Sequence, residues 1–567
     1  MRSLGPSRTG VFCAARDDAR GKRANRRVVP DFRFGGTRKA GIVRGNSTPA
    51  TRDRFNLDLK SVGQITEQSL PLEENVGPAV QGGLRGFFAK FTVLGGAQRE
   101  LWLTFVIKLL IISAYSVTNK TLILWLSSDL GFSDQAAGAL VGWVWAPAMT
   151  VFTLLAGSLT DALGLRRTFF FGVFVCLVAR AVMVFTAIPW LALAGGLFPL
   201  VIGEALGTPV LIAATRRYST TQQRSISFSI IYMVMNVGYL IAAQIFDYIR
   251  QSLGEHGHIT LFGSEISAYR SLFLVSLGFE LLLLPTIYFL RRGAEATDEG
   301  VKFTAEPMLH ATGAFWDRIF LTVRDTALDT IRLFKRLLSQ SGFYRLLAFL
   351  ILIGFLKLIF LQTDYVFPKF GIRELGEGAP IGHLLAINYL LIIVLVPVIG
   401  ALTQQFSAYR MVAVGGAICA ASVFVMALPT AWFQSPANGA VGQWLGHSYL
   451  GVKGSIHPYY IMTAIYTAIF SVGEAFYSPR VYEYAAAIAP KGQEASYGAL
   501  SYVPFLFGKL LVGTGGWLLA AFCPEHGPRH SGTMWLIFAL AASVAPIGLL
   551  LFRSYIRVPE AGREQTS

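Results

Sequence analysis

Ionisable side chains interrupt several long apolar runs of this sequence. The clearest cases are Glu204, Glu280, Lys357, Glu474 and Lys509. An ionisable group at the centre of a lipid bilayer costs at least about 2.5–3.5 kcal/mol, so its presence indicates a function or a charged partner. The chemistry that suits these groups is reversible binding. The carboxylates could hold a proton or a cation, and the ammonium groups could hold a carboxylate or a phosphate.

Four of these charges, all but Glu280, also have a structural explanation. Glu474 could form a structural ion pair with a lysine on a neighbouring helix, either Lys357 or Lys509. Glu204 stands in the sequence GEALG, which could be a packing turn between helices. The residues by themselves leave both explanations open.

The apolar runs that carry these charges are long enough to cross a membrane. A membrane-spanning helix needs roughly 20 mostly apolar residues, twice the length of a transmembrane β-strand. The first six predicted spans are 101–126, 136–156, 168–188, 190–213, 225–247 and 271–290. The other six are 343–366, 380–402, 410–430, 457–481, 496–521 and 532–553. We therefore expect an all-α membrane protein with twelve transmembrane helices.

The composition agrees with a polytopic membrane protein. Hydrophobic residues make up 53% of the 567 residues and charged residues only 14%, whereas about 25% is usual for soluble proteins. The net charge of +16 does not indicate nucleic-acid binding, because residues 1–60 alone hold 15 Lys and Arg against 5 Asp and Glu. The four cysteines have the spacing of neither a metal site nor a disulfide framework.

The segment 1–100 is expected to be a basic, largely disordered cytosolic tail that binds anionic lipid headgroups. For residues 1–60, an organelle transit peptide and an incorrect translation start are the alternatives. Lys and Arg near the span ends predict that both termini are cytosolic. The inner loops then contain Arg166, Arg167, Arg216, Arg217, Arg224, Arg291, Arg292, Arg480 and Lys491, whereas the outer connections 127–135 and 187–190 contain none.

The predicted domains are two helical bundles, 101–290 and 343–553, followed by a cytosolic tail, 554–567. The polar segment 291–342 links the bundles. Within it, 315–338 has apolar residues at helical spacing, namely Trp316, Ile319, Val323, Ala327, Ile331 and Phe334. This pattern predicts an amphipathic helix on the cytosolic face of the bundles or the lipid headgroups.

Two short sequences occur in both halves of the chain. GSLTDALGLRR (157–167) aligns with GALTQQFSAYR (400–410), and GEALGTP (203–209) aligns with GEAFYSP (473–479). The second alignment places Glu204 opposite Glu474. Since each match lies at equivalent spans, the sequence predicts two pseudo-symmetric six-helix bundles.

The segment 157–167 also resembles the signature G-x-L-x-D-x-x-G-R-[KR] of the major facilitator superfamily, which lies between the second and third helices of that fold. The resemblance implies a major facilitator fold in which Asp161 faces the N-terminus of helix 11, whose dipole favours an anion. The implied cytosolic gate consists of Gly157, Asp161, Gly164, Arg166 and Arg167. On charge alone, these Asp and Arg residues could simply flank the spans as topology signals.

A narrower resemblance is to the proton-dependent oligopeptide transporter branch of this superfamily. FSIIYMVMNVG (228–238) resembles its helix-5 pattern F-Y-x-x-x-N-x-G, and 471–492 resembles its helix-10 segment. This implies that Tyr232 and Asn236 face a substrate and that Glu474 binds a proton or a cationic substrate group. Asn236 could instead form an interhelical hydrogen bond.

Two further points concern the end of the seventh predicted span and the charged motif that the oligopeptide transporter branch carries in helix 1. Gln362 is placed in the same substrate pathway, whereas Asp364, two residues later, could be an outer-loop residue. The branch carries E-x-x-E-R-F-x-Y-Y in helix 1, a motif tied to proton coupling. Here the matching register reads KLLIISAYS, with Lys108, Ile111 and Ile112 at the charged positions.

The expected function is transport of a small polar solute by alternating access, such as a short peptide or an amino-acid derivative, with protons as the candidate coupling ion. The alternatives are an organic-anion carrier, which Lys108, Lys357 and Lys509 favour, and a non-transporting receptor or scaffold with the same fold. No catalytic or ATP-binding motif is found, so we expect no enzyme, no cofactor and no metal. We expect a monomer in the plasma membrane or an organelle membrane, with the solute and the lipid bilayer as partners.

Overall fold

The computed structural model describes residues 92–303 except 255, 256, 262 and 298, residues 338–488 except 404 and 405, residues 503–557, and single positions between 317 and 335. Most of both predicted tails and most of the predicted amphipathic helix, including Trp316, Ile319, Val323, Ala327 and Phe334, lie outside the described residues. All the described residues belong to one compact unit, Gln64–Ser567.

The first six predicted spans are helical, with bounds close to those expected from hydropathy. They are α3 (Arg99–Ser128), α4–η2–α5 (Asp134–Ala139, Leu140–Trp145, Ala146–Leu163), α6 (Leu165–Phe185), α7–η3–α8 (Pro189–Leu191, Ala192–Leu197, Phe198–Arg217), α9 (Thr221–Leu253) and α10 (Ala268–Tyr288). The segments η2 and η3 are π-helical turns within otherwise α-helical spans.

The C-terminal half repeats this arrangement. Its spans are α12 (Ser341–Tyr365), α14 (Ile381–Leu402), α15 (Ala408–Phe424) continued by η4 (Val425–Ala427), α18 (Pro458–Ile488), α20 (Val503–Phe522) and α21 (Ser531–Leu551). In the described part of the chain, ten helices are long and apolar enough to cross a membrane. Together with α18 and the apolar helix within α20, they make the twelve predicted helices.

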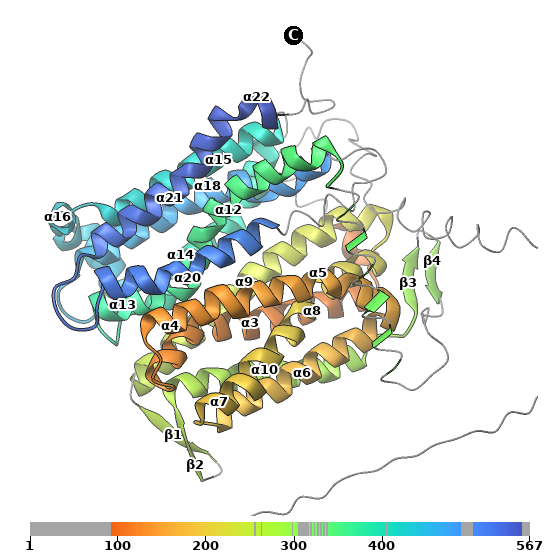
Figure 1. Cartoon of the computed structure of the whole chain (residues 1–567), viewed down its shortest axis with the longest axis horizontal. Helices are drawn as coiled ribbons and strands as arrows, with labels where there is room; N and C mark the ends of the chain where they lie inside the picture. Colours follow the sequence, from red (N-terminus) through yellow and green to blue (C-terminus); the bar gives the residue numbers. More distant parts are fainter. Residues whose placement is uncertain are drawn as a thin grey trace, which may run out of the picture. The chain divides into compact units, whose positions relative to one another are not determined.

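Short elements cap the two ends of the bundles. They are η1 (Thr92–Gly96), β1 (His258–Leu261), β2 (Ser264–Ser267), β3 (Ala294–Thr297), β4 (Gly300–Phe303), α13 (Phe367–Leu375), η5 (Thr430–Phe433), α16 (Gln434–Asn438), α17 (Ala440–Gln443), η6 (Trp444–Tyr449) and α22 (Arg553–Ile556). The two antiparallel hairpins lie at opposite ends of the helices (Figure 1). We call these ends the β1–β2 end and the β3–β4 end.

The sequence did not predict the hairpins. In β1–β2, Leu261 pairs with Ser264, and Gly263 in the two-residue turn has a φ of 76°. Two-residue hairpin turns need such left-handed backbone, which glycine adopts without strain.

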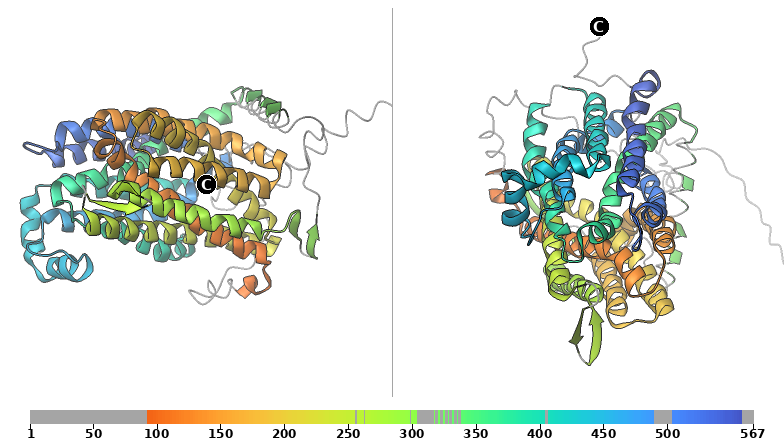
Figure 2. Two further views of the ribbon diagram at one scale, coloured as in Figure 1. Left: turned by 90° about the horizontal axis from the view of Figure 1, so that it is seen from below. Right: turned by 90° about the vertical axis from the view of Figure 1, so that its left-hand side faces the viewer.

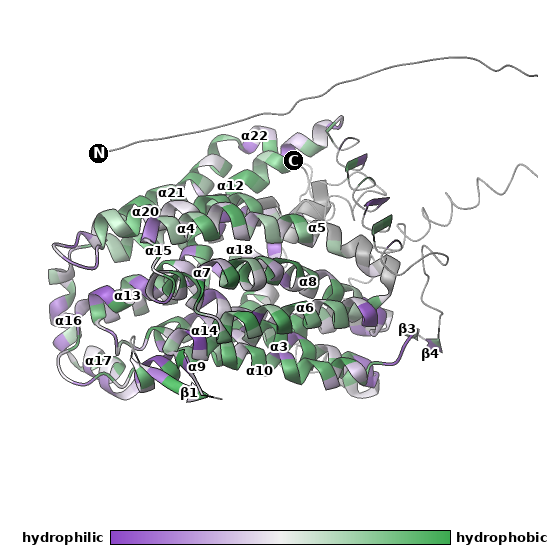
Figure 3. Ribbon diagram, turned by 60° about the horizontal axis from the view of Figure 1, so that its bottom comes forward, coloured by the Kyte–Doolittle hydropathy of each residue, from purple (hydrophilic) through white to green (hydrophobic). Residues whose placement is uncertain are grey.

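In the described part of the chain, helices of the two halves pack against each other at several places. These include α9 with α14, the span α4–η2–α5 with α20, and α3 with α12 and α13. Viewed along the helices, the two halves form separate groups (Figure 2, right). Hydrophobic residues line the lengths of the helices and hydrophilic residues gather mainly at their ends (Figure 3). This distribution is that of a multi-pass integral membrane protein.

Candidate functional site

Glu204 on α8 and Glu474 on α18 occupy equivalent places in the two halves. The glycine before each carboxylate touches a cysteine of the neighbouring helix so closely that a Cβ atom there would overlap the Sγ atom. These cysteines are Cys176 on α6 and Cys419 on α15, which the alignment of 157–167 with 400–410 also places opposite each other. The predicted repeat is therefore confirmed at the level of contacts, and the two carboxylates can be compared directly.

In the N-terminal half, Glu204 belongs to a buried ion cluster. The guanidinium of Arg180 on α6 lies 2.7 Å from Oε1 of Glu204 and 2.7 Å from Oε1 of Glu280 on α10. Nε of Arg180 also donates to Oγ1 of Thr118 on α3 at 3.3 Å. Oε2 of each carboxylate is buried and has no hydrogen-bond partner among the described residues. We call Arg180, Glu204 and Glu280 the Arg180 cluster; it holds one positive and two negative charges.

In the C-terminal half, the same alignment places Val423 opposite Arg180. Glu474 therefore has different partners. Its Oε2 accepts a hydrogen bond from the amide of Asn388 on α14 at 3.0 Å, and its Oε1 accepts one from the hydroxyl of Tyr232 on α9 at 3.4 Å. Since α9 belongs to the N-terminal half and α14 to the C-terminal half, Glu474 lies at the interface between the bundles.

Lys357 on α12 interacts with the charge of Glu474. Nζ of Lys357 is 4.7 Å from the ring centroid of Phe360 and 5.2 Å from that of Tyr477. Such cation–π contacts are worth about 2 kcal/mol when the ammonium ion is desolvated. Glu474 and Lys357 thus place one negative and one positive group close to the interface.

A second ion pair joins the bundles directly. Nζ of Lys120 on α3 lies 2.6 Å from Oδ1 of Asp364, in the last turn of α12. The ring centroids of Tyr239 on α9 and Tyr389 on α14 are 5.4 Å apart in a stacked arrangement, and Nζ of Lys120 is 5.8 Å and 5.7 Å from them. Asp364 is therefore part of a helix and of the interface, not an outer-loop residue.

Two further contacts connect the bundles at the β1–β2 end. Asp134, at the start of α4, pairs with Lys369 and with Arg373 of α13, the latter at 2.7 Å. Burial lowers the pKa of Lys369, and the charge of Asp134 opposes this shift. Asp247 of α9 accepts hydrogen bonds from the backbone and the ring of His383 at 2.8 Å and 2.7 Å, at the N-terminus of α14. That position also lets the dipole of α14 stabilise the carboxylate.

The remaining predicted pathway residues are distributed around this interface. Lys509 on α20 is 5% exposed and interacts with the charge of Glu204 from the opposite bundle. Asn236 donates to the backbone oxygen of Tyr232 on its own helix, at 2.9 Å. Gln362 is 1% exposed, and neither polar atom of its amide has a hydrogen-bond partner among the described residues. The structure thus groups Tyr232 with Glu474 and Glu204 with Lys509, while the amide of Gln362 lies against Gly515 of α20.

The predicted gate residues lie at the β3–β4 end. Gly164 joins α5 to α6 with a φ of 83°, a left-handed conformation that favours glycine. The guanidinium of Arg166 lies over the rings of Phe170 and Tyr288, 5.7 Å and 5.2 Å from their centroids, and Arg167 is exposed. Gly157 and Asp161 are positions of α5, and the side chain of Asp161 lies outside the described residues.

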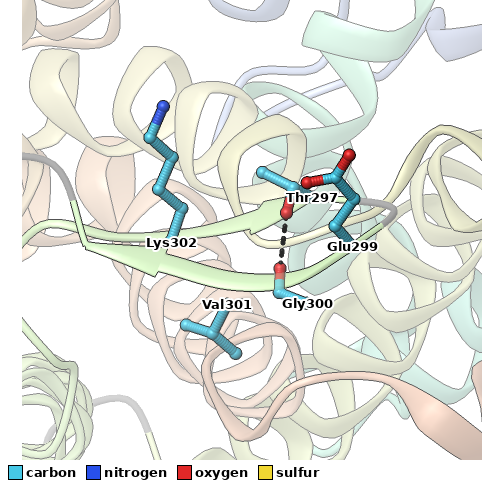
Figure 4. A pocket seen from close by; sticks show the side chains of 5 residues that line it. All are labelled: Thr297, Glu299, Gly300, Val301 and Lys302. Atoms are coloured by element: carbon cyan, nitrogen blue, oxygen red, sulfur yellow. Dashed lines mark hydrogen bonds between the residues drawn. The ribbon is translucent and has the colours of Figure 1, made fainter.

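The β3–β4 hairpin carries a surface hollow of about 530 Å³ (Figure 4). Its lining residues are Thr297, Glu299, Gly300, Val301 and Lys302, of which all but Thr297 are exposed. It lies apart from the charges at the bundle interface and offers a solute no buried polar group. We do not assign it to the functional site.

Sequence reasoning missed three partners that the structure supplies. They are Arg180, which pairs with Glu204, Asn388, which binds Glu474, and Asp364, which pairs with Lys120. A sequence signal existed for Arg180 and Lys120, because both stand inside apolar runs. In the described part of the chain, no three His, Cys, Asp or Glu residues are grouped in a way that could hold a metal ion.

Comparisons with known proteins agree with this architecture. The sequence profile of the Major Facilitator Superfamily matches residues 104–456. Comparison with curated proteins gives no match.

Similar solved structures include a bacterial homologue of the human drug peptide transporters PepT1 and PepT2, with a TM-score of 0.57 and 18% identity over 81% of this chain and 98% of that one. A POT family transporter in complex with 5-aminolevulinic acid has a TM-score of 0.59 and 18% identity over 81% and 97%. A mutant peptide transporter POT in complex with sulfate has a TM-score of 0.60 and 15% identity over 82% and 98%. At these identities the likeness shows a shared fold. From the profile match over most of its length, this chain belongs to the Major Facilitator Superfamily of membrane transporters.

Proposed function

We propose that this transporter moves a small zwitterionic solute, such as a short peptide or an amino-acid derivative, through the interface between its two bundles. Transport proceeds by alternating access and draws its energy from a proton gradient. No ATP-binding motif is present in the sequence, which supports gradient-driven transport.

The proposal rests on one observation: Glu204 and Glu474, which occupy equivalent places in the two halves, have different partners for their negative charges. Glu204 is paired with a guanidinium of its own bundle. Among the described residues, Glu474 is instead held by the neutral groups of Asn388 and Tyr232 and interacts with the charge of Lys357. A solute ammonium group can replace the hydroxyl of Tyr232 on Glu474. A buried carboxylate gains more from a cation than from a neutral donor.

The carboxylate end of the solute needs a cation of its own. Lys509 suits this role, because it is buried on α20 and has no hydrogen-bond partner among the described residues. One of the similar structures is a complex with 5-aminolevulinic acid, which carries an amino group and a carboxylate. That ligand has the same pair of charged ends as the solute proposed here.

The contacts at the β1–β2 end give the direction of the conformational change. Lys120, Asp134 and Asp247 join the bundles at or towards that end, so transport requires these contacts to break and re-form. The positive-inside rule places the β3–β4 end, with its arginines, in the cytosol. In this orientation the structure is closed towards the outer side.

The proposal is tested by uptake of labelled dialanine into proteoliposomes that contain the purified protein, with and without an inward proton gradient. Wild-type protein should accumulate dialanine only with the gradient. Glu474→Gln should lower uptake at least about tenfold, because an amide cannot pair with an ammonium group. Glu265→Gln, a change at an exposed residue of strand β2, serves as the matched control and should leave uptake unchanged.

Lack of uptake by folded wild-type protein would contradict the peptide proposal. The second candidate is then an organic-anion carrier, which the buried lysines Lys108, Lys357 and Lys509 favour. One similar structure holds sulfate. Uptake of a labelled dicarboxylate in the same vesicles distinguishes the two, because it should survive Glu474→Gln and be lost in Lys509→Gln.

A further inference from the structure

The Arg180 cluster has an unbalanced charge within its own bundle. Arg180 supplies one positive charge to Glu204 and Glu280, and the side chains of all three are at most 5% exposed. An uncompensated charge in a dry interior costs several kcal/mol, so a buried cluster takes up a proton or a cation that restores neutrality.

Two buried carboxylate oxygens are free to accept that charge. Oε1 of each carboxylate is occupied by Arg180, but Oε2 of Glu204 and Oε2 of Glu280 have no hydrogen-bond partner among the described residues. A proton on either oxygen would form an ordinary carboxylic acid beside the ion pair. The proton is assigned to Glu204 and Glu280 together and not to either one, because two carboxylates that share one guanidinium titrate together.

One cation from the opposite bundle competes for the same charge. Lys509 on α20 interacts with Glu204, has no hydrogen-bond partner among the described residues, and is 5% exposed. With Lys509 close, two positive charges balance two negative ones. When the bundles separate at this level, Lys509 moves away with α20 and the Arg180 cluster again lacks one positive charge.

The other titratable groups around Glu204 do not supply that charge. Among the described residues, the groups that interact with it from the neighbouring helices are Tyr115 on α3, Cys176 on α6 and Tyr365 on α12, besides Arg180, Glu280 and Lys509. Tyr115, Tyr365 and Cys176 are neutral when protonated. Arg180 is already shared by the two carboxylates, so among the described residues Lys509 is the remaining cation that interacts with Glu204.

We propose that the Arg180 cluster carries the transported proton, and that Lys509 and this proton take turns as its neutralising charge. Water on one side of the membrane gives a proton to a free Oε2 while Lys509 is distant. The approach of Lys509 in the other conformation breaks that O–H bond and releases the proton to water on the other side. The inference rests on the proposed proton coupling and names the groups that perform it.

The first test is infrared spectroscopy of the protein in lipid, which detects the carbonyl stretch of a protonated buried carboxylic acid. Wild-type protein should show this band at low pH and lose it on titration to high pH. Glu204→Gln and Glu280→Gln should each weaken the band by removing the contribution of the Arg180 cluster, because either change leaves one carboxylate for Arg180 and removes the need for a proton. Glu100→Gln, a buried carboxylate of the same bundle that pairs with Arg291, is the matched control and should keep it.

Lys509→Gln should have the opposite spectroscopic effect. Without its competitor the Arg180 cluster keeps the proton, so the band should persist where the wild type has lost it. Loss of the band in this variant, or its survival unchanged in both Glu→Gln variants, would overturn the proposal. Lys509→Gln removes a side chain that makes no hydrogen bond among the described residues, so this test remains decisive if the cluster variants do not fold.

The second test separates coupling from solute binding. In proteoliposomes without a gradient, Glu204→Gln and Glu280→Gln should still exchange dialanine across the membrane. With a proton gradient, their accumulation of dialanine should be at least about tenfold lower than that of the wild type. Unchanged accumulation would contradict proton carriage by the cluster. If wild-type protein does not move dialanine at all, the proposed substrate fails, and the infrared result still decides whether the Arg180 cluster binds the proton.

Discussion

Lys120 on α3 and Asp364 on α12 form a 2.6 Å ion pair that ties the two bundles together. The stacked rings of Tyr239 and Tyr389 flank it, one from each bundle. Lys120 is fully buried, whereas the side chain of Asp364 remains 24% exposed. The charge of Lys120 therefore depends on this pair for compensation, whereas water can also reach Asp364. A contact that must open during transport needs such access to water.

Asp364→Asn should favour the conformation in which the β1–β2 end is open. Removing one partner of a buried ion pair costs about 3–5 kcal/mol, because the other charge stays buried and uncompensated. Spin labels at positions 251 and 525, on exposed residues of opposite bundles at this end, should report longer distances than in the wild type. The exchange variant Lys120→Asp with Asp364→Lys should restore the short distances; an unchanged distribution in Asp364→Asn would contradict the role of the pair.

Val423→Arg should inactivate transport by giving Glu474 the kind of partner that Glu204 already has. The alignment places Val423 opposite Arg180, and Val423 is fully buried. A guanidinium there can pair with Glu474 and block its contact with a solute ammonium group. Dialanine uptake should fall at least about tenfold, the loss expected when a charge-assisted contact is removed.

Val423→Met is the matched control for that substitution. It also enlarges the side chain but brings no charge, and overpacking of this kind costs about 1–3 kcal/mol. It should lower the unfolding temperature while leaving most of the uptake. Equal loss of uptake in the two variants would mean that size, and not charge, inactivates the protein.

Gly203→Ala and Gly473→Ala should destabilise the protein by similar amounts. A Cβ atom at either position would overlap a cysteine Sγ and neighbouring backbone of the adjacent helix. We expect each to cost about 1–3 kcal/mol in thermal unfolding. Gly278→Ala, where nothing lies within 4 Å of the added atom, should cost much less. A large difference between the first two variants would contradict the equivalence of the two packing sites.

The twelve helices and the internal repeat could be predicted because their signals are local. A run of apolar residues needs no knowledge of its neighbours, and the match between GEALGTP and GEAFYSP lies in adjacent positions. The side chains that Glu204 and Glu474 face could not be predicted in the same way. Those contacts depend on the rotation of each helix about its axis, which only packing in three dimensions sets.

Arg180 illustrates the limit. It lies five residues before the end of α6, so the sequence allowed it to reach the membrane surface. In the structure its side chain turns inward and is 1% exposed, because Glu204 and Glu280 offer two carboxylates at that level. Asp364 is a similar case. It stands one residue before the end of α12, and hydropathy does not fix helix ends closely enough to distinguish a loop residue from a helical partner of Lys120.

Gly142→Val should also favour opening of the β1–β2 end, through packing and not through charge. Gly142 of η2 lies against Gly513 of α20, and an added Cβ atom would overlap the backbone there. Overpacking of about 1–3 kcal/mol changes the ratio of two conformations by about 5–150-fold, so labels at positions 251 and 525 should shift to longer distances. Gly278→Val has open space for its side chain and should leave the distances unchanged. Equal distributions in both variants would mean that close contact between η2 and α20 does not hold this end closed.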